Sequence, residues 1–184
     1  ERGFTVTVNS TTAVCGTLQL GSTATNSSTG TLAFATSGNP ILTVSGAVTI
    51  GSNGNTGRTG TITFQNGATL HATSVLLGGT GSNAAAGTIN MTNGGTLKVN
   101  DIINGTGTRT WTPGTGTVEI TDNTTLPSAT FTSFNNLNIN SGATVTSGAS
   151  FSVAGTMTVS GVFVPGATSH VISGSGGTLT GTGT

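Results

Sequence analysis

The sequence repeats itself, and this repeat limits the folds open to the chain more than any other feature. The segment "GTITFQNGATLHATSVLLGG" at 60–79 is followed by "GTINMTNGGTLKVNDIINGT" at 87–106, and eight of twenty aligned positions are identical. Most other positions exchange similar residues, such as Phe64 with Met91. A repeat of this length is typical of proteins built from one stacked structural unit.

The repeat extends over the whole chain when the apolar residue of each "G-T-apolar-x-apolar" phrase serves as a reference point. We expect these reference residues to stack in one column: Val6, Leu32, Ile62, Ile89, Val118, Leu137, Met157 and Leu179. Their spacing is 26 to 30 residues up to Val118 and 19 to 22 residues beyond it. The chain is therefore predicted to be one domain over 1–184, with long coils over 1–116 and short coils over 117–184.

Each repeat has the pattern of short strands separated by bends. Threonine and apolar residues alternate, which indicates a strand with one buried face. Asn-Gly or Ser-Gly then predicts a turn in which Gly67, Gly94 and Gly142 take a positive φ. The pattern predicts an all-β fold, namely a single-stranded right-handed parallel β-solenoid (β-helix) of about eight coils. At a spacing of about 4.8 Å the rod would be roughly 35 Å long. The alternative fold is a β-sandwich of the pilin type.

The alignment also predicts which residues share a face. One inward column is expected to contain Val14, Leu70, Leu97, Leu126 and Val145, and another to contain Ile62, Ile89 and Val118. The extra residues of the long coils are expected at one corner: 21–30, 51–60, 78–87 and 104–116. These columns define the predicted core.

Composition narrows the classes of function. Only eight of the 184 residues are charged, four of each sign. A surface of this kind favours self-association and lacks the basic stretches that bind nucleic acid or an anionic membrane. No apolar run is long enough to insert across a membrane. Cys15 has no disulfide partner and is expected to be a small buried apolar residue. The start at Glu1, without Met, indicates a processed form or an excised segment.

Three phrases carry a family likeness: "TWTPGTGTVEI" at 110–120, "FNNLNINSGATV" at 134–145 and "GTMTVSG" at 155–161. This wording resembles the β-strand repeats of secreted, repeat-rich bacterial surface proteins of the adhesin-like and autotransporter-passenger-like group. The resemblance covers about a quarter of the chain. It implies an extracellular right-handed β-helix that acts as a stalk, an adhesin or a matrix fibre at the cell surface or in a biofilm. It implies no catalytic residues.

The sequence predicts no enzyme, no cofactor and no metal site. The four acidic residues do not cluster, and His71 and His170 lie far apart, so no set of side chains supplies the roles that catalysis or metal binding requires. Arg109 and Trp111, in the longest insertion, are candidate surface-contact residues for a glycan or a host or cell surface. The competing interpretation is that Trp111 folds its loop back onto a neighbouring coil.

The outward threonines suggest an ice-binding array as an alternative function. Thr-x-Thr on stacked strands forms a flat surface suited to ice. The residues that directly follow the reference residues form one of the two outward columns. This column contains Glu119 and two asparagines, Asn90 and Asn138, which would interrupt a regular plane.

The ends of the predicted solenoid lead to the favoured function. Each end leaves a row of unpaired backbone groups, and we see no helix or charged cap in the sequence there. We expect Phe4, Val6, Val8 and Leu179 to lie on the end strands. The chain is therefore expected to be a non-enzymatic extracellular structural protein that binds copies of itself head to tail in a filament. An adhesin or stalk segment of a larger surface protein is the alternative.

Overall fold

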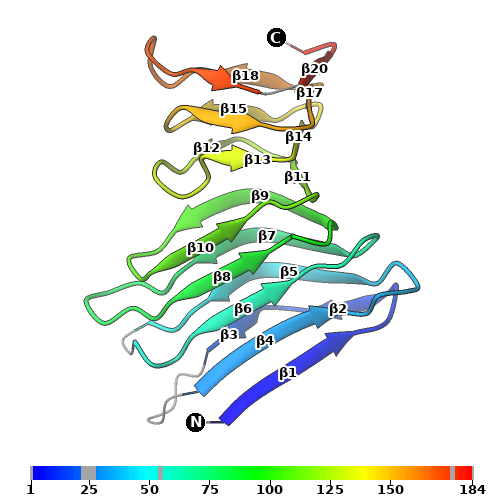
Figure 1. The fold of residues 1–184 in the computed structure, drawn as a ribbon, viewed down its shortest axis with the longest axis vertical. Helices are drawn as coiled ribbons and strands as arrows, with labels where there is room; N and C mark the ends of the chain where they lie inside the picture. The colour runs from blue at the N-terminus through cyan, green and yellow to red at the C-terminus, as the bar shows by residue number, and fades with distance from the viewer. Residues whose placement is uncertain (1, 22–27, 54–55, 175–176, 184) are drawn as a thin grey trace.

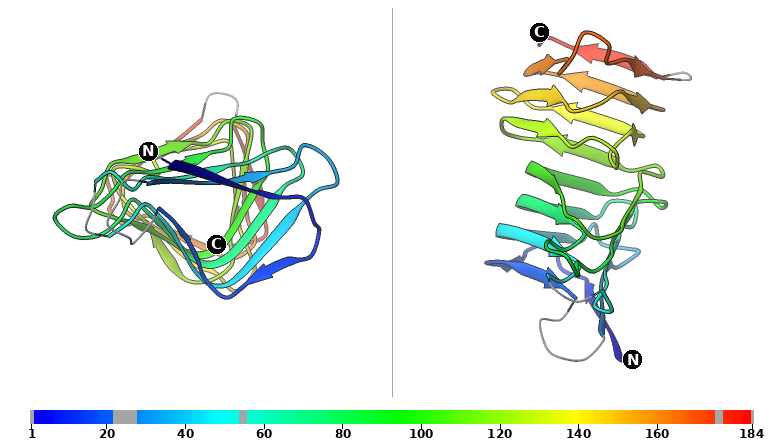
Figure 2. Two further views of the ribbon diagram at one scale, coloured as in Figure 1. Left: turned by 90° about the horizontal axis from the view of Figure 1, so that it is seen from below. Right: turned by 90° about the vertical axis from the view of Figure 1, so that its left-hand side faces the viewer.

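The structure, a computed structural model, describes residues 2–21, 28–53, 56–174 and 177–183. Within these ranges there is no helix, and every strand pairing is parallel. The strands are stacked from the N-terminal end to the C-terminal end (Figure 1), and successive coils lie over one another in the view along the stack (Figure 2). The predicted all-β parallel β-solenoid is confirmed. No strand pairing among the described residues is antiparallel, as the pairings of a β-sandwich would be.

Four parallel sheets run along the stack. Sheet A consists of β1 (Arg2–Val8), β4 (Ser28–Phe34), β6 (Gly60–Thr63), β8 (Gly87–Asn90) and β10 (Arg109–Thr112). Sheet B consists of β2 (Ala13–Cys15), β3 (Leu18–Leu20), β5 (Ile41–Ile50), β7 (Thr69–Leu77), β9 (Thr96–Asn104), β11 (Thr117–Ile120), β14 (Asn136–Ile139), β17 (Thr156–Val159) and β20 (Thr178–Gly181). Sheet C consists of β12 (Thr124–Leu126), β15 (Thr144–Ser147) and β18 (Val162–Val164). Sheet D consists of β13 (Ser133–Phe134), β16 (Phe151–Val153) and β19 (Ile172–Ser173).

The architecture changes between β10 and β11, where the sequence predicts the change from long to short coils. Sheet B continues through this point, whereas sheet A ends at β10 and sheets C and D begin with β12 and β13. Side-chain contacts join sheets A and B to sheets C and D. Thr124 of sheet C donates a hydrogen bond to Asp101, and Trp111 of sheet A packs against Phe134 of sheet D.

The predicted reference column is wrong at one step. Its first part is correct, because Val6, Leu32, Ile62 and Ile89 stack in sheet A. The next residue in that stack is Trp111 and not Val118. Val118 stacks on Leu97 in sheet B, and Leu137, Met157 and Leu179 follow it there. The same alternating pattern occurs on every side of the coil, so the pattern does not identify the sheet.

The predicted inward column that starts at Val14 is also wrong in part. Leu70 and Leu97 do stack and are fully buried. Val14 pairs with Thr43 on the outer face of sheet B and is 77% exposed. Leu126 and Val145 are buried in sheet C, where they occupy different register positions.

The core lies inside the stack and is formed by the inward side chains of all four sheets. Phe34 and Phe64 stack with their ring centroids 5.2 Å apart in the first half. In the second half an aromatic ladder crosses the change of sheets, and its members are Trp111, Phe131, Phe134, Phe151 and Phe163. Contacts between like side chains therefore hold the coils in register.

The turns have the backbone that the sequence predicts. Gly67, Gly94 and Gly142 have φ values of 78°, 90° and 87°. At the insertion corner the coils approach so closely that a Cβ on Gly79 would collide with the carbonyl oxygen of Ser52. Backbone hydrogen bonds stack this corner from coil to coil, as in Gly78 N to Ile50 O at 2.8 Å and Gly105 N to Leu77 O at 2.8 Å. Of the first insertion, 21–30, residues 22–27 lie outside the described ranges.

The stacked core predicts unequal costs for two substitutions. Leu97→Ala should lower the free energy of unfolding by roughly 2–5 kcal/mol, because it leaves a cavity lined by the residues above and below it. Thr88→Ala, on the outer face of sheet A, should cost about half a kcal/mol. Chemical denaturation of the two variants measures both values. A larger loss for Thr88→Ala would contradict the assignment of inner and outer faces.

Candidate functional site

The N-terminal end of the stack exposes apolar side chains that face the core. Strand β1 pairs only with β4 in the described part of the chain. Phe4 and Val6 occupy the inward positions of β1 but are 64% and 61% exposed, because no described strand covers them. Val8, further along the same strand, is buried. Cys15 in β2 is half-buried and not fully buried as predicted, because β2 is also an edge strand.

The C-terminal end is hollow. Strand β20 pairs only with β17 in the described part of the chain, and Leu179 at its centre is 73% exposed. A cavity of about 630 Å³ opens there, lined mainly by apolar side chains that include Met157, Val159, Phe163, Ile172 and Leu179. Sheets B, C and D contribute to this lining, and the sequence alignment identified only the residues of sheet B, Met157 and Leu179 among them. The segments "VFV" at 162–164 and "VIS" at 171–173 were the signal for the other two.

The first and last coils carry nearly all of the large exposed apolar side chains. Among the described residues, the large exposed apolar side chains are Phe4, Val6, Val14, Ile103, Val162, Val164, Val171, Ile172 and Leu179. All except Ile103 belong to the first or the last coil. Concentrated apolar surface marks an interaction site, and an unpaired strand edge is a template for another strand.

Trp111 and Arg109 are engaged within the fold. The Trp111 indole donates from Nε1 to the carbonyl oxygen of Ser133 at 2.7 Å and packs on Phe131, with ring centroids 5.0 Å apart. Arg109 donates from Nε to the hydroxyl of Thr130 at 2.8 Å and from Nη1 to backbone carbonyls of its own turn. Both side chains are half-buried, and they link β10 to the following coil.

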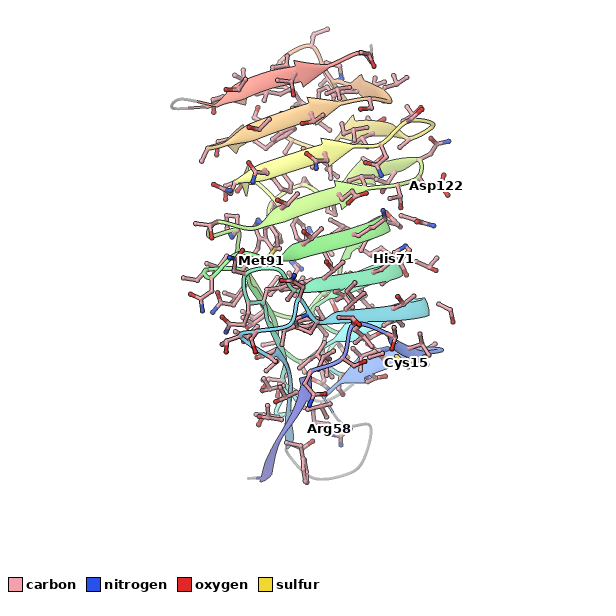
Figure 3. All side chains as sticks on the ribbon, turned by 90° about the vertical axis from the view of Figure 1, so that its right-hand side faces the viewer. Cys15, Arg58, His71, Met91 and Asp122 are labelled. Atoms are coloured by element: carbon pink, nitrogen blue, oxygen red, sulfur yellow. The ribbon has the colours of Figure 1, made fainter. Side chains whose placement is uncertain are left out.

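Sheet B carries a row of titratable side chains on its outer face. His71 pairs with Lys98, and Lys98 pairs with Glu119. Lys98 Nζ and Asn140 Nδ2 donate to the same Glu119 oxygen, at 2.7 and 2.6 Å. Partial burial alone would raise the pKa of Glu119, but these hydrogen bonds and the charge of Lys98 outweigh it, so the pKa lies below its ordinary value. Figure 3 shows His71 on this side of the stack and Asp122 nearer the C-terminal end.

A second pair, Ser147 and His170, lies near the C-terminal end. The Ser147 hydroxyl lies 3.0 Å from His170 Nδ1 and accepts a hydrogen bond from the backbone of Gly166 at 3.0 Å. Ser147 is 2% exposed, so its oxygen holds the last loop in place and does not face an open pocket.

The described residues contain no group of three or more His, Cys, Asp or Glu side chains arranged to hold a metal ion. Within the same ranges there is no helix with the length and apolar character needed to cross a bilayer.

No protein-family model matches the sequence, and comparison with curated proteins and with solved structures gives no match. The likeness to bacterial surface-protein repeats therefore stays a hypothesis based on the wording of residues 110–161.

The pKa of Glu119 leads to a pH-dependent stability. Because the folded pKa is lowered, the stabilisation is complete above the unfolded value of about 4.3 and is lost as pH falls through the folded value. At neutral pH, Glu119→Gln should be less stable than the wild type by about 1 kcal/mol or less, as for a partly exposed ion pair. Denaturation over a pH series should show this difference disappearing in acid. Asp122→Asn, an exposed acid-to-amide change, is the control, and a pH-independent Glu119→Gln difference would refute the prediction.

The contacts of Trp111 lead to a second stability prediction. Trp111→Ala should cost about 3 kcal/mol, the lower end of the range for a buried tryptophan, because the ring is half-buried. Trp111→Phe keeps the ring packing and loses the bond to Ser133, so it should cost about 1 kcal/mol. Thermal unfolding compares the two. If Trp111→Ala melted like the wild type, the side chain would serve an external contact instead.

Proposed function

We propose that the chain is a non-enzymatic structural protein that works outside the cell and joins copies of itself end to end in a filament or surface fibre. The observation that carries this proposal is the exposure of core-facing apolar side chains at both ends, above all Phe4, Val6 and Leu179. A side chain of this type contributes about 1.5–3 kcal/mol when it is fully buried. An end-to-end contact buries several of them at once.

The sheets indicate how such a joint is made. Sheet B begins with β2 and ends with β20, so stacking one copy on the next continues sheet B across the joint. On another side of the coil, β1 of one copy meets β19 of the other, because sheet D occupies the side on which sheet A ends. Phe4 and Val6 then project toward Ile172 and the hollow at the C-terminal end. Backbone pairing between the strands fixes the orientation of one copy on the next, and the burial of apolar side chains supplies most of the free energy of association.

The side chains that could carry chemistry support a structural role. Lys98 and Glu119 bond each other on the outer face of sheet B, and Ser147 is buried beneath the last loop. The hollow at the C-terminal end is comparable in size to a ligand pocket, but its lining is largely apolar and it lies where the joint would form. A catalytic site requires convergent polar groups in a pocket.

A stalk or adhesin segment of a larger surface protein is the second candidate, because the same ends would accept further coils of one longer chain. The two candidates differ in how the 184-residue chain behaves alone. A filament subunit associates with itself, whereas a stalk segment stays a single rod.

Electron microscopy and light scattering of the purified chain test the proposal. We expect filaments whose mass grows with concentration. Phe4→Asp should abolish them, because it places a charge in the apolar joint. Thr5→Asp is the matched control, since Thr5 is the next residue on the same strand and faces outward, and it should assemble like the wild type.

A chain that stays monomeric at high concentration would overturn the filament proposal and favour the stalk segment. Equal loss of assembly in Phe4→Asp and Thr5→Asp would place the joint elsewhere than on the inward face of β1. Circular dichroism establishes that both variants keep the β-fold.

A further inference from the structure

The outer face of sheet A is a regular array of threonines. We define the threonine face as the outward residues of its five strands: Thr5, Thr7, Thr31, Ala33, Thr61, Thr63, Thr88, Asn90, Thr110 and Thr112. Each strand contributes two of them, separated by one inward residue. All ten are exposed or half-exposed, and Figure 1 shows the five strands side by side with their arrows in the same direction.

The register of sheet A arranges these residues in two straight rows. The first row is threonine on all five strands, and the second is threonine on three, with Ala33 and Asn90 on the other two. Glu119 and Asn138, which interrupt the array in the sequence alignment, lie on sheet B and not on this face. The rows repeat every 4.8 Å or so across the strands and about every 6.6 Å along them.

The chemistry of the face is uniform. None of its eight threonine hydroxyls makes a side-chain hydrogen bond within the described residues, whereas Thr158 and Thr180 on sheet B bond each other at 3.2 Å. The face holds no charged side chain, in contrast to the row of His71, Lys98 and Glu119 on sheet B. Each threonine therefore presents a free hydroxyl beside a methyl group.

We propose that the threonine face binds ice. An uncharged array with a regular repeat in two directions is complementary to a solid surface that has its own repeat. Small molecules need a concave pocket, and protein partners are usually bound through aromatic, Met or Arg side chains, none of which the face contains. Its free hydroxyls hold water at regular positions, and its methyl groups limit the orientations of that water, so the bound layer matches the ice lattice.

This function is independent of the end-to-end joint. The face lies along the side of the stack, so it stays open in a single rod and in a fibre. In a fibre, successive copies repeat the array at intervals, because sheet D lies between the sheet A of one copy and that of the next.

Thermal hysteresis and the shape of ice crystals test the proposal with the intact chain. The wild type should lower the freezing point below the melting point and produce faceted crystals. Thr61→Lys, at the centre of the face, should lose most of this effect, because a charged, flexible side chain breaks the plane. Thr96→Lys on the outer face of sheet B is the matched control and should retain it.

Three outcomes would overturn the proposal. The first is that the wild type leaves the freezing point and the crystal shape unchanged. The second is that Thr61→Lys and Thr96→Lys reduce the effect on ice equally. The third outcome is binding to crystalline cellulose or chitin without any effect on ice, which would assign the face to polysaccharide. Thermal melts confirm that both lysine variants fold.

Discussion

Backbone pairing between successive coils is the interaction on which the rest of this structure depends. Because every pairing between the described strands is parallel and the coil spacing is set by the hydrogen bonds, each paired residue lies over a counterpart in the next coil. Side chains at inward positions therefore pack against similar side chains in the neighbouring coil, as Phe34 does on Phe64 and Leu70 does on Leu97. Where the coils approach closely, as at Gly79 and Gly105, only glycine fits beside the neighbouring carbonyl.

The same constraint explains why the ends differ from the sides. A coil inside the stack is covered above and below, whereas the first and last coils are covered on one side only. Some of their inward side chains, such as Phe4, Val6 and Leu179, are therefore exposed although they have the pattern of core residues. The two ends are also unlike each other, since Phe4 and Val6 project at one and a cavity of about 630 Å³ opens at the other. Unlike ends favour head-to-tail contact, which continues along one axis and does not close.

The sides of the stack carry different chemistry. Sheet B has the titratable row, in which Glu119 is held by Lys98 and Asn140. Sheet A has an uncharged threonine face. A parallel stack separates these properties because each column of outward residues stays on one side over its whole length. The proposed roles in assembly and in surface binding therefore involve different residues of the same coils.

The sequence alone determined the all-β parallel fold and the glycine turns at Gly67, Gly94 and Gly142. Alternation and repeat length encode these features locally. Only the tertiary structure decided which sheet each strand enters. Val118 and Ile89 have the same local pattern, yet they lie in sheets B and A, because Trp111 takes the position above Ile89. Period-two alternation distinguishes inside from outside but not one side of a coil from another. The composition of the threonine face and the hollow at the C-terminal end therefore depend on contacts between strands that are distant in sequence.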